Sequence, residues 1–250
     1  MKTLPSLDAH AHLDPTRPAS ELAHSGAVLA MTFSLQGAAL AVGRRDRNIA
    51  WGVGCHPGDL RAQQEFDIGL FRELVEQTAV VGEIGLDGGA RVALRVQVQT
   101  FRQALRVITD LPRVVSIHSA GAAGLVLQEL QRTPVAVPVL HGWRGTVAET
   151  RQAVALGCYF SVQAVMARHS KFRTAVPPER LLFETDHGTG DPPAAIPCRI
   201  EWTEHLIAQQ LRLGVKEVRR LGWRNLRTIV RQADVHKLLP TTLAAWLGAF

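Results

Sequence analysis

Eight short apolar runs recur along the 250-residue chain, and segments with helical periodicity separate most of them. The runs are rich in Val, Ile and Leu, as expected of strands that are covered on both faces. Eight repeats of a strand followed by a helix predict parallel pairing with the helices outside. The predicted strands are Pro5–Ala9, Gly26–Ser34, Ile49–Cys55, Val80–Leu86, Arg113–His118, Val137–His141, Gly157–Val162 and Arg180–Glu184.

Apolar residues spaced three to four apart predict the intervening helices. The clearest are Ile68–Gln77, Leu94–Thr109, Ala122–Gln131 and Thr146–Leu156. The tail Trp202–Phe250 also has helical patterns, with breaks expected near Gly214, Gly222 and Pro240, and the Gly- and Pro-rich segment His187–Pro197 predicts a loop after the eighth strand. The length suits one (β/α)8 (TIM) barrel. We therefore expect a single α/β domain over residues 1–250.

Composition narrows the class of protein. No apolar stretch is long enough to cross a membrane, and the N-terminal residues lack the blocks of a signal peptide, so a cytoplasmic location without membrane contact is expected. Cys55, Cys158 and Cys198 form no CxxC pair, which argues against a disulfide framework or a thiolate zinc site. The net charge of +6 comes mostly from Arg. It permits an anionic substrate, although GC-rich coding also favours Arg.

Polar side chains cluster at the ends of the predicted strands. In a barrel of this kind all the carboxyl ends of the strands meet at one mouth, where catalytic residues lie. The residues in question are His10 and His12 at the first strand, His56 after the third, Glu83 in the fourth, His118 and His141 ending the fifth and sixth, and Asp186 after the eighth.

These residue types suit divalent cations. His10 and His12 are two apart in a strand, so they point the same way and can bind one ion together. Imidazole and carboxylate ligands suit zinc or manganese. Glu83 could bridge two ions, a pair of which activates water and stabilises the leaving oxygen in phosphoester hydrolysis. Asp186 could accept the proton of that water.

Each residue also has an ordinary structural interpretation. His118 and His141 could be core histidines, and Asp186 could cap a helix. Glu83 lies among apolar neighbours, where burial is costly unless the acid is paired or metal-bound. The joint pattern at strand ends favours a site. Histidines in helical or loop contexts are interpreted as structural, and His187 is left open; the former are His24, His169, His205 and His236.

Several segments resemble the TatD family of metal-dependent deoxyribonucleases, within the wider amidohydrolase group of barrels. The match follows the order of the chain over nearly its whole length. The segments are Leu7–Asp14, Gly54–Pro57, Gly82–Asp87, Ile117–Ser119, His141–Gly145, Tyr159–Val162 and Pro178–Asp186, with Gln97, Phe101 and Asn225 also fitting the pattern.

The resemblance implies two divalent metal ions (Mg, Mn or Zn) and DNA as the substrate, often cleaved from a 3′ end. One ion would be held by His10, His12, Glu83 and Asp186, and the other by Glu83, His118 and His141. It places His56 near the substrate phosphate. Arg144 is a candidate for an additional phosphate contact, with a solvated loop charge as the alternative.

Three positions depart from the family pattern. Gly88-Gly89 stands where the family usually has Tyr, Ala120 where it has Arg, and His187-Gly188 where it has Ser-Pro. The metal ligands are kept while positions that face the substrate differ, which predicts an active hydrolase with an altered substrate. The chain is similar to TatD-like proteins of bacterial Qat-type antiphage clusters, which implies antiviral defence and other proteins of a defence complex as partners.

Three hypotheses remain open. The first is a phosphodiesterase that acts on DNA. The second is a hydrolase of an amide, ester or lactone, although the fourth strand lacks a Lys that could be a carbamylated ligand. The third is a non-catalytic, metal-stabilised subunit, motivated by the altered positions and by aromatic residues in the tail, which favour interfaces. Those residues are Trp202, Trp223 and Trp246.

Overall fold

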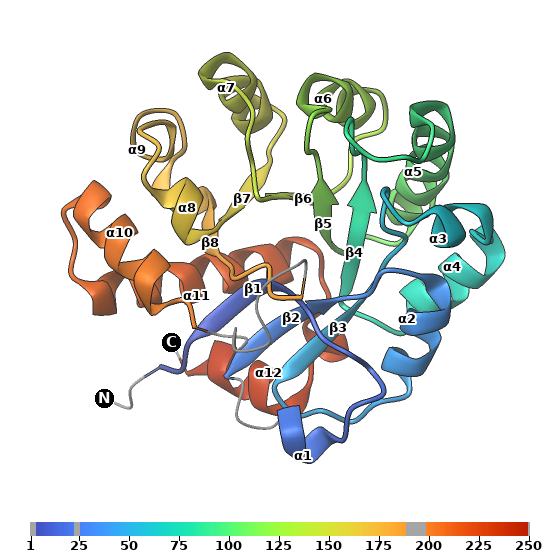
Figure 1. Ribbon diagram of the computed structural model, residues 1–250. Coiled ribbons are helices and arrows are strands. Elements are labelled where there is room, and N and C mark those ends of the chain that lie inside the picture. The colour runs from blue at the N-terminus through green and yellow to red at the C-terminus, as the bar shows by residue number, and fades with distance from the viewer. Residues whose placement is uncertain (1–3, 23–25, 189–198, 250) are drawn as a thin grey trace.

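Eight parallel strands form a nearly closed barrel with helices between them (Figure 1). The computed structural model describes residues 4–22, 26–188 and 199–249. The predicted α/β TIM barrel is thereby confirmed. The strands are β1 (Leu7–His12), β2 (Ala27–Met31), β3 (Ile49–Val53), β4 (Val80–Gly85), β5 (Val114–His118), β6 (Val137–His141), β7 (Tyr159–Val162) and β8 (Leu181–Phe183).

The strands pair in sequence order, and side-chain and backbone hydrogen bonds bridge the remaining seam between β8 and β1. The carboxylate of Asp8, which is fully buried, accepts hydrogen bonds from the backbone N–H of Thr185 at 3.0 Å and from its hydroxyl at 2.6 Å. The backbone N–H of Asp186 donates to the carbonyl of His10 at 3.0 Å. A buried acid in β1 therefore fixes the position of the segment after β8.

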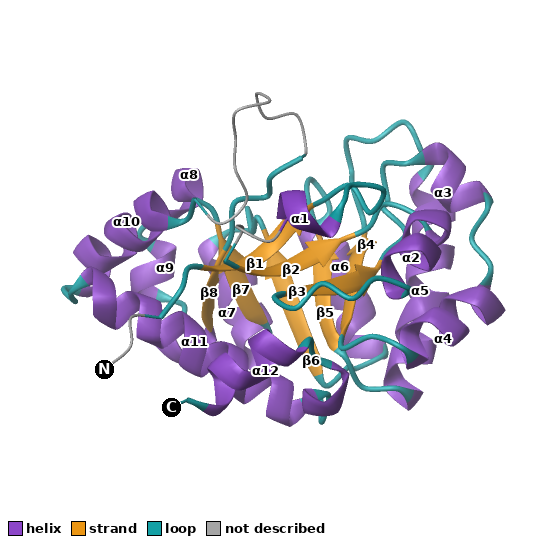
Figure 2. Cartoon of the chain, turned by 90° about the horizontal axis from the view of Figure 1, so that it is seen from below, coloured by secondary structure: helices purple, strands orange, loops and turns teal. Residues whose placement is uncertain are grey.

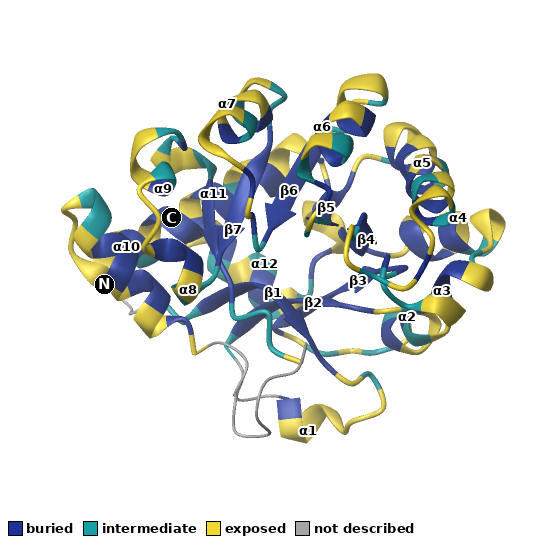
Figure 3. Cartoon of the chain, turned by 45° about the horizontal axis from the view of Figure 1, so that its top comes forward, coloured by how far each residue is buried: buried dark blue, intermediate teal, exposed yellow. Residues whose placement is uncertain are grey.

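The helices pack around the barrel with their buried faces toward the strands (Figure 3). All four clearly predicted helices are present, with ends shifted by at most one residue. The helices are α1 (Ala19–Leu22), α2 (Leu35–Val42), α3 (Leu60–Gln64), α4 (Ile68–Glu76), α5 (Leu94–Asp110), α6 (Ala123–Arg132), α7 (Val147–Ala155), α8 (Ala164–Ala167), α9 (Lys171–Thr174), α10 (Glu201–Leu211), α11 (Val215–Gln232) and α12 (Thr241–Gly248), with short 3₁₀ turns η1 (Pro178–Arg180) and η2 (His236–Leu238).

The predicted break at Gly222 is wrong, because α11 continues through it. The breaks at Gly214 and Pro240 are confirmed, since these residues immediately precede α11 and α12. Gly222 serves packing instead: a Cβ at this position would lie 3.0 Å from the ring of Phe183 in β8. The missing side chain lets α11 approach the strand closely.

The C-terminal helices close one end of the barrel. The inward side chains at the amino ends of the strands pack against α11 and α12, which lie side by side (Figure 2). Trp223 is fully buried there, and its indole N–H donates to the carbonyl of Pro5 at 3.0 Å. With this end filled by apolar residues, the polar strand ends are confined to the opposite mouth.

Some of the predicted features lie outside the residues that the structure describes. The predicted loop His187–Pro197 lies largely outside the described residues, and so do His24 and Cys198. Cys55 and Cys158 are buried core residues, as predicted. In the described ranges, none of the helices combines the length and apolarity that crossing a membrane requires.

The contact between α11 and β8 predicts a position-specific effect. We expect Gly222→Val to lower the free energy of unfolding by about 2 kcal/mol, because its side chain must displace Phe183 in a packed layer. Gly248→Val is the matched control, since a Cβ there meets nothing within 4 Å. Urea unfolding of both variants measures the difference, and equal stabilities would contradict the packing role.

Candidate metal centre

Six of the residues selected from the sequence meet at the mouth of the barrel. His10 and His12 come from β1, and the remaining four come from the ends of other strands. Four of the six are at most 6% exposed, and Asp186 and His118 are partly buried. The six residues are His10, His12, Glu83, His118, His141 and Asp186.

The first group of ligand atoms surrounds one oxygen of Glu83. The Nε2 atoms of His10 and His12 are 3.3 Å apart, and Glu83 Oε2 lies 3.0 Å from the second of these. Asp186 Oδ1 lies 3.6 Å from His10 Nε2. Ligand atoms about 2.1 Å from one ion are roughly 3.0–3.4 Å from each other, so this group fits a divalent cation with little movement.

A second group surrounds the other oxygen of the same carboxylate. Glu83 Oε1 contacts both His118 Nδ1 and His141 Nε2, and these two nitrogens are 3.1 Å apart. The two oxygens of Glu83 therefore face two different pairs of imidazoles, as a bridging carboxylate would.

Hydrogen bonds at Nδ1 orient the imidazole rings of His10 and His12. His12 Nδ1 lies 3.2 Å from the carbonyl of Met31, an acceptor, so this nitrogen carries the proton and leaves the lone pair on Nε2. His10 Nδ1 lies 2.7 Å from the hydroxyl of Ser116. Such outer contacts fix the ring and the tautomer of metal-binding histidines.

Sequence reasoning missed Glu184, Asp87 and Gln163, which lie behind the ligands. Glu184 Oε1 is 3.7 Å from His141 Nδ1 and accepts a hydrogen bond from the backbone of Gly142 at 2.9 Å. Asp87 Oδ2 lies 3.4 Å from His118 Nε2, and the amide of Gln163 donates to Asp186 at 2.8 Å. Glu184 was detectable in principle, because it follows the apolar run of β8 and is 1% exposed.

His56 also reaches the site, but its neutral ring is a different tautomer from that of His12. The backbone N–H of Gly58 donates to His56 Nδ1 at 3.0 Å, so the neutral ring carries its proton on Nε2. Burial lowers the pKa of this imidazole, which keeps the ring neutral. Nε2 lies 3.6 Å from Glu83 Oε2. His56 thus presents an N–H donor to the mouth rather than a lone pair.

Arg144 is exposed in the loop between β6 and α7. It lines a cavity of about 430 Å³ together with Ser119, Gly121 and Thr146. The structure does not bring Arg144 into contact with the six clustered residues in the described part of the chain. It lies at the same end of the barrel as the cluster.

Charged side chains within the cluster stabilise one another. Burial alone would raise the pKa of Glu83, but His141 and the hydrogen-bonded imidazoles hold it well below its usual value. Burial opposes the charged form of His141 too, yet Glu83 and Glu184 raise its pKa well above the usual value. Burial and the neighbouring His141 hold the pKa of His10 well below its usual value. A cation would take over the pairing that the imidazolium provides.

The three departures from the family pattern all lie at backbone contacts. A Cβ at Gly88 would lie 2.3 Å from the carbonyl oxygen of Gly121, and the backbone N–H of Gly88 donates to the carbonyl of Ala120 at 2.8 Å. The carbonyl of His187 accepts from the backbone N–H of His12 at 2.7 Å. The loops that border the mouth are therefore joined through their backbones at these positions.

Solved structures share this fold. A TatD homologue from Escherichia coli K12, YjjV, superposes with a TM-score of 0.73 at 20% identity, covering 89% of this chain and 97% of that one. An uncharacterised amidohydrolase from Saccharomyces cerevisiae superposes with a TM-score of 0.68 at 15% identity, covering 90% and 100%. Fold and site together define a TIM barrel with a cluster of imidazoles and carboxylates at its mouth.

The family profile described as TatD related DNase matches residues 7–231, and the chain belongs to this family. A relative from Cronobacter sakazakii, the 3′-5′ ssDNA/RNA exonuclease TatD, is 31% identical over 161 residues, which cover 59% of this chain and 60% of the relative. The same exonuclease from Cronobacter turicensis is 31% identical over 147 residues, covering 54% and 55%. The matches span at most about 60% of these relatives' own length.

The environment of Asp186 predicts a pH-dependent step. Burial raises the pKa of this carboxyl to about 6. The folded protein therefore holds the proton more tightly than the unfolded chain, and this stabilisation is lost as the pH rises through 6. Below pH 6 a metal ion that binds Asp186 must displace the proton of this carboxyl. At pH 5, Mn²⁺ binding to the wild type should therefore release about one more proton than Mn²⁺ binding to Asp186→Asn.

Titration calorimetry in buffers of different ionisation enthalpy measures this release. At pH 7.5 Asp186 is already ionised, so the excess over the Asn variant should vanish. Equal proton release by both proteins at pH 5 and at pH 7.5 would show that Asp186 has an ordinary pKa.

Proposed function

We propose that this chain is a metal-dependent phosphodiesterase that cleaves DNA, working inward from an end of the strand. The observation that carries the proposal is Glu83, whose two oxygens face separate groups of imidazoles at the mouth of the barrel. Its membership of a family described as TatD related DNase supports DNA as the substrate class.

Two divalent ions fit the ligand set: one beside His10, His12, Glu83 and Asp186, and one beside Glu83, His118 and His141. The distances between the candidate ligand atoms are those found in a coordination shell. Carboxylate and imidazole groups are also suitable ligands for Mg, Mn or Zn. When bound, such ions lower the pKa of a water molecule and neutralise charge on a phosphate.

The protein's own groups position the reactants. Asp186, held by Gln163 through one oxygen, is placed at the mouth to accept the proton of the attacking water. The Nε2–H of His56 donates to a phosphate oxygen. Arg144 contacts a further phosphate from the loop after β6, where its guanidinium is exposed.

Removing the bridging carboxylate should remove the activity. We expect Glu83→Gln to lower kcat on single-stranded DNA by more than about 100-fold in Mn²⁺, because an amide cannot bridge two cations. Release of nucleotides from an end-labelled strand measures the rate. His56→Gln should mainly raise KM for DNA.

Glu129→Gln is the control, since Glu129 is also a buried acid, paired to Arg102 at 2.7 Å and remote from the mouth. It should lower Tm yet keep kcat near that of the wild type. A metal-replete protein that hydrolyses esters, lactones or amides, but neither DNA nor RNA, would overturn the phosphodiesterase proposal.

We also propose that the enzyme works in bacterial antiviral defence, in the cytoplasm and with other proteins of a defence complex. The support is the combination of intact ligands with altered mouth positions such as Gly88 and Ala120. In cells that carry this gene with its neighbours, Asp186→Asn should restore phage plating. Unchanged protection would exclude a catalytic role in defence.

A further inference from the structure

Helix α11 presents a row of basic side chains to solvent. The residues are spaced four, four, three and four apart, which places them on one face of the helix. They cover about 22 Å at a rise of about 1.5 Å per residue. We call this row the α11 basic face: Lys216, Arg220, Arg224, Arg227 and Arg231, all exposed except the half-buried Arg227.

Some arginines on other helices have an acidic partner three or four residues away, as in Arg61–Glu65 and Arg72–Glu76. Among the described residues, Lys216, Arg220, Arg224 and Arg231 have no ion-pair partner. Like charges three or four apart destabilise a helix, so folding does not require the row.

The neighbouring Arg219, also on α11, is paired with an acid of α10. Its guanidinium forms a bidentate pair with Glu204 of α10, at 2.9 and 2.6 Å. That pair is on the packed side of α11. On the solvent side Glu217, in the first turn, is an exposed acid, and its carboxylate accepts a hydrogen bond from the backbone N–H of Gly214 at 2.7 Å.

The α11 basic face lies at the end of the barrel opposite the metal centre. The other side of α11 buries Trp223, Leu226, Ile229 and Val230 beneath the amino ends of the strands. Its last residue, Gln232, donates to the carbonyl of Ala136 just before β6. The helix therefore crosses the closed end of the barrel, beside α12 (Figure 2).

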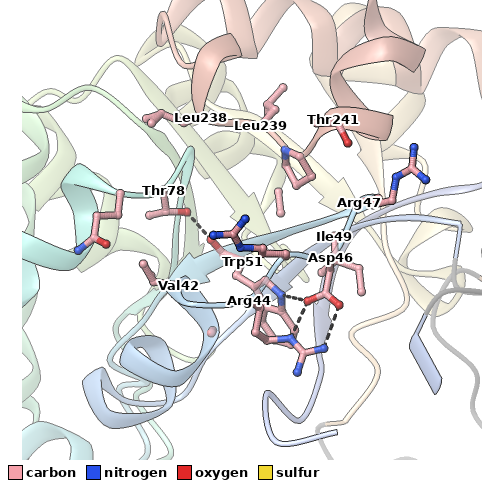
Figure 4. Close-up of a pocket in the computed structure, with 15 residues that line it drawn as sticks. Val42, Arg44, Asp46, Arg47, Ile49, Trp51, Thr78, Leu238, Leu239 and Thr241 are labelled. Atoms are coloured by element: carbon pink, nitrogen blue, oxygen red, sulfur yellow. Dashed lines mark hydrogen bonds and ion pairs between the residues drawn. The ribbon is translucent and has the colours of Figure 1, made fainter. Parts of the chain in front are cut away.

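A basic cavity continues this surface beyond the end of α11. It measures about 380 Å³ and is lined by Leu238 and Leu239, which follow α11, and by the loop before β3 (Figure 4). Arg44 in that loop is paired to Asp46, whereas Arg45 and Arg47 are exposed. Cationic side chains thus extend from α11 across the closed end.

We propose that the α11 basic face binds the phosphate backbone of single-stranded nucleic acid, as a second contact for strands whose end lies in the metal centre. This inference rests on the proposed nuclease function. Evenly spaced cations suit a polyanion. The row has no aromatic or aliphatic anchor between its charges, and such anchors are what a protein partner would need.

The test compares two triple variants of equal net charge. Arg220→Gln/Arg224→Gln/Arg231→Gln alters the row, and Arg106→Gln/Arg151→Gln/Arg173→Gln alters exposed arginines on the outer helices. Binding of a fluorescent 30-nucleotide oligo-dT is followed by anisotropy without added metal, from 50 to 200 mM salt. Hydrolysis of a 4-nucleotide and a 30-nucleotide strand is then followed in Mn²⁺.

The row variant should bind the 30-mer at least about tenfold more weakly than the wild type at low salt. The slope of log affinity against log salt concentration should become shallower by about two, because each of the three lost phosphate contacts contributes about 0.7. Hydrolysis of the 4-mer should be unchanged, while KM for the 30-mer rises. Because the substitutions remove repulsion, Tm should stay equal or rise. The control variant should match the wild type in slope.

Equal binding of the 30-mer by the two triple variants would overturn the inference and leave an acidic protein as the occupant of this face. A wild type that binds the 30-mer through the row but hydrolyses neither strand would refute the nuclease proposal alone. A wild type that hydrolyses the 4-mer but fails to bind the 30-mer would refute the second contact alone.

Discussion

A buried carboxylate among imidazoles is the constraint on which the site depends. Glu83 is fully buried, and a lone charge in that position would cost several kcal/mol. His141 offsets this cost, because Glu83 and Glu184 raise the pKa of its imidazole well above the usual value.

The scaffold makes this arrangement rigid. Asp8 ties the segment after β8 to β1, so that Asp186 is placed relative to His10 by backbone contacts. The closed end is filled by α11 and α12, and Gly222 lets α11 approach β8. Ser116 and the carbonyl of Met31 fix the histidine rings from behind. Each ligand is therefore held by an element that packing already positions.

The two ends of the barrel carry opposite chemistry. The mouth gathers acids and imidazoles around positions for cations, and His56 adds an N–H donor. The closed end presents the cations of the α11 basic face. Under the two proposals, a polyanionic strand would be attracted to both ends, at the mouth through metal ions and at the far end directly.

The sequence determined the repeated strand and helix pattern and the candidate ligand residues, because burial periodicity and polar residues at strand ends are local signals. Only the tertiary structure revealed that Glu83 faces two groups, that Glu184 and Gln163 lie behind the ligands, and that His56 is an N–H donor. These facts depend on contacts between residues far apart in the chain. Gly222 shows the same limit: its sequence context resembles a helix break, but its role is set by the ring of Phe183.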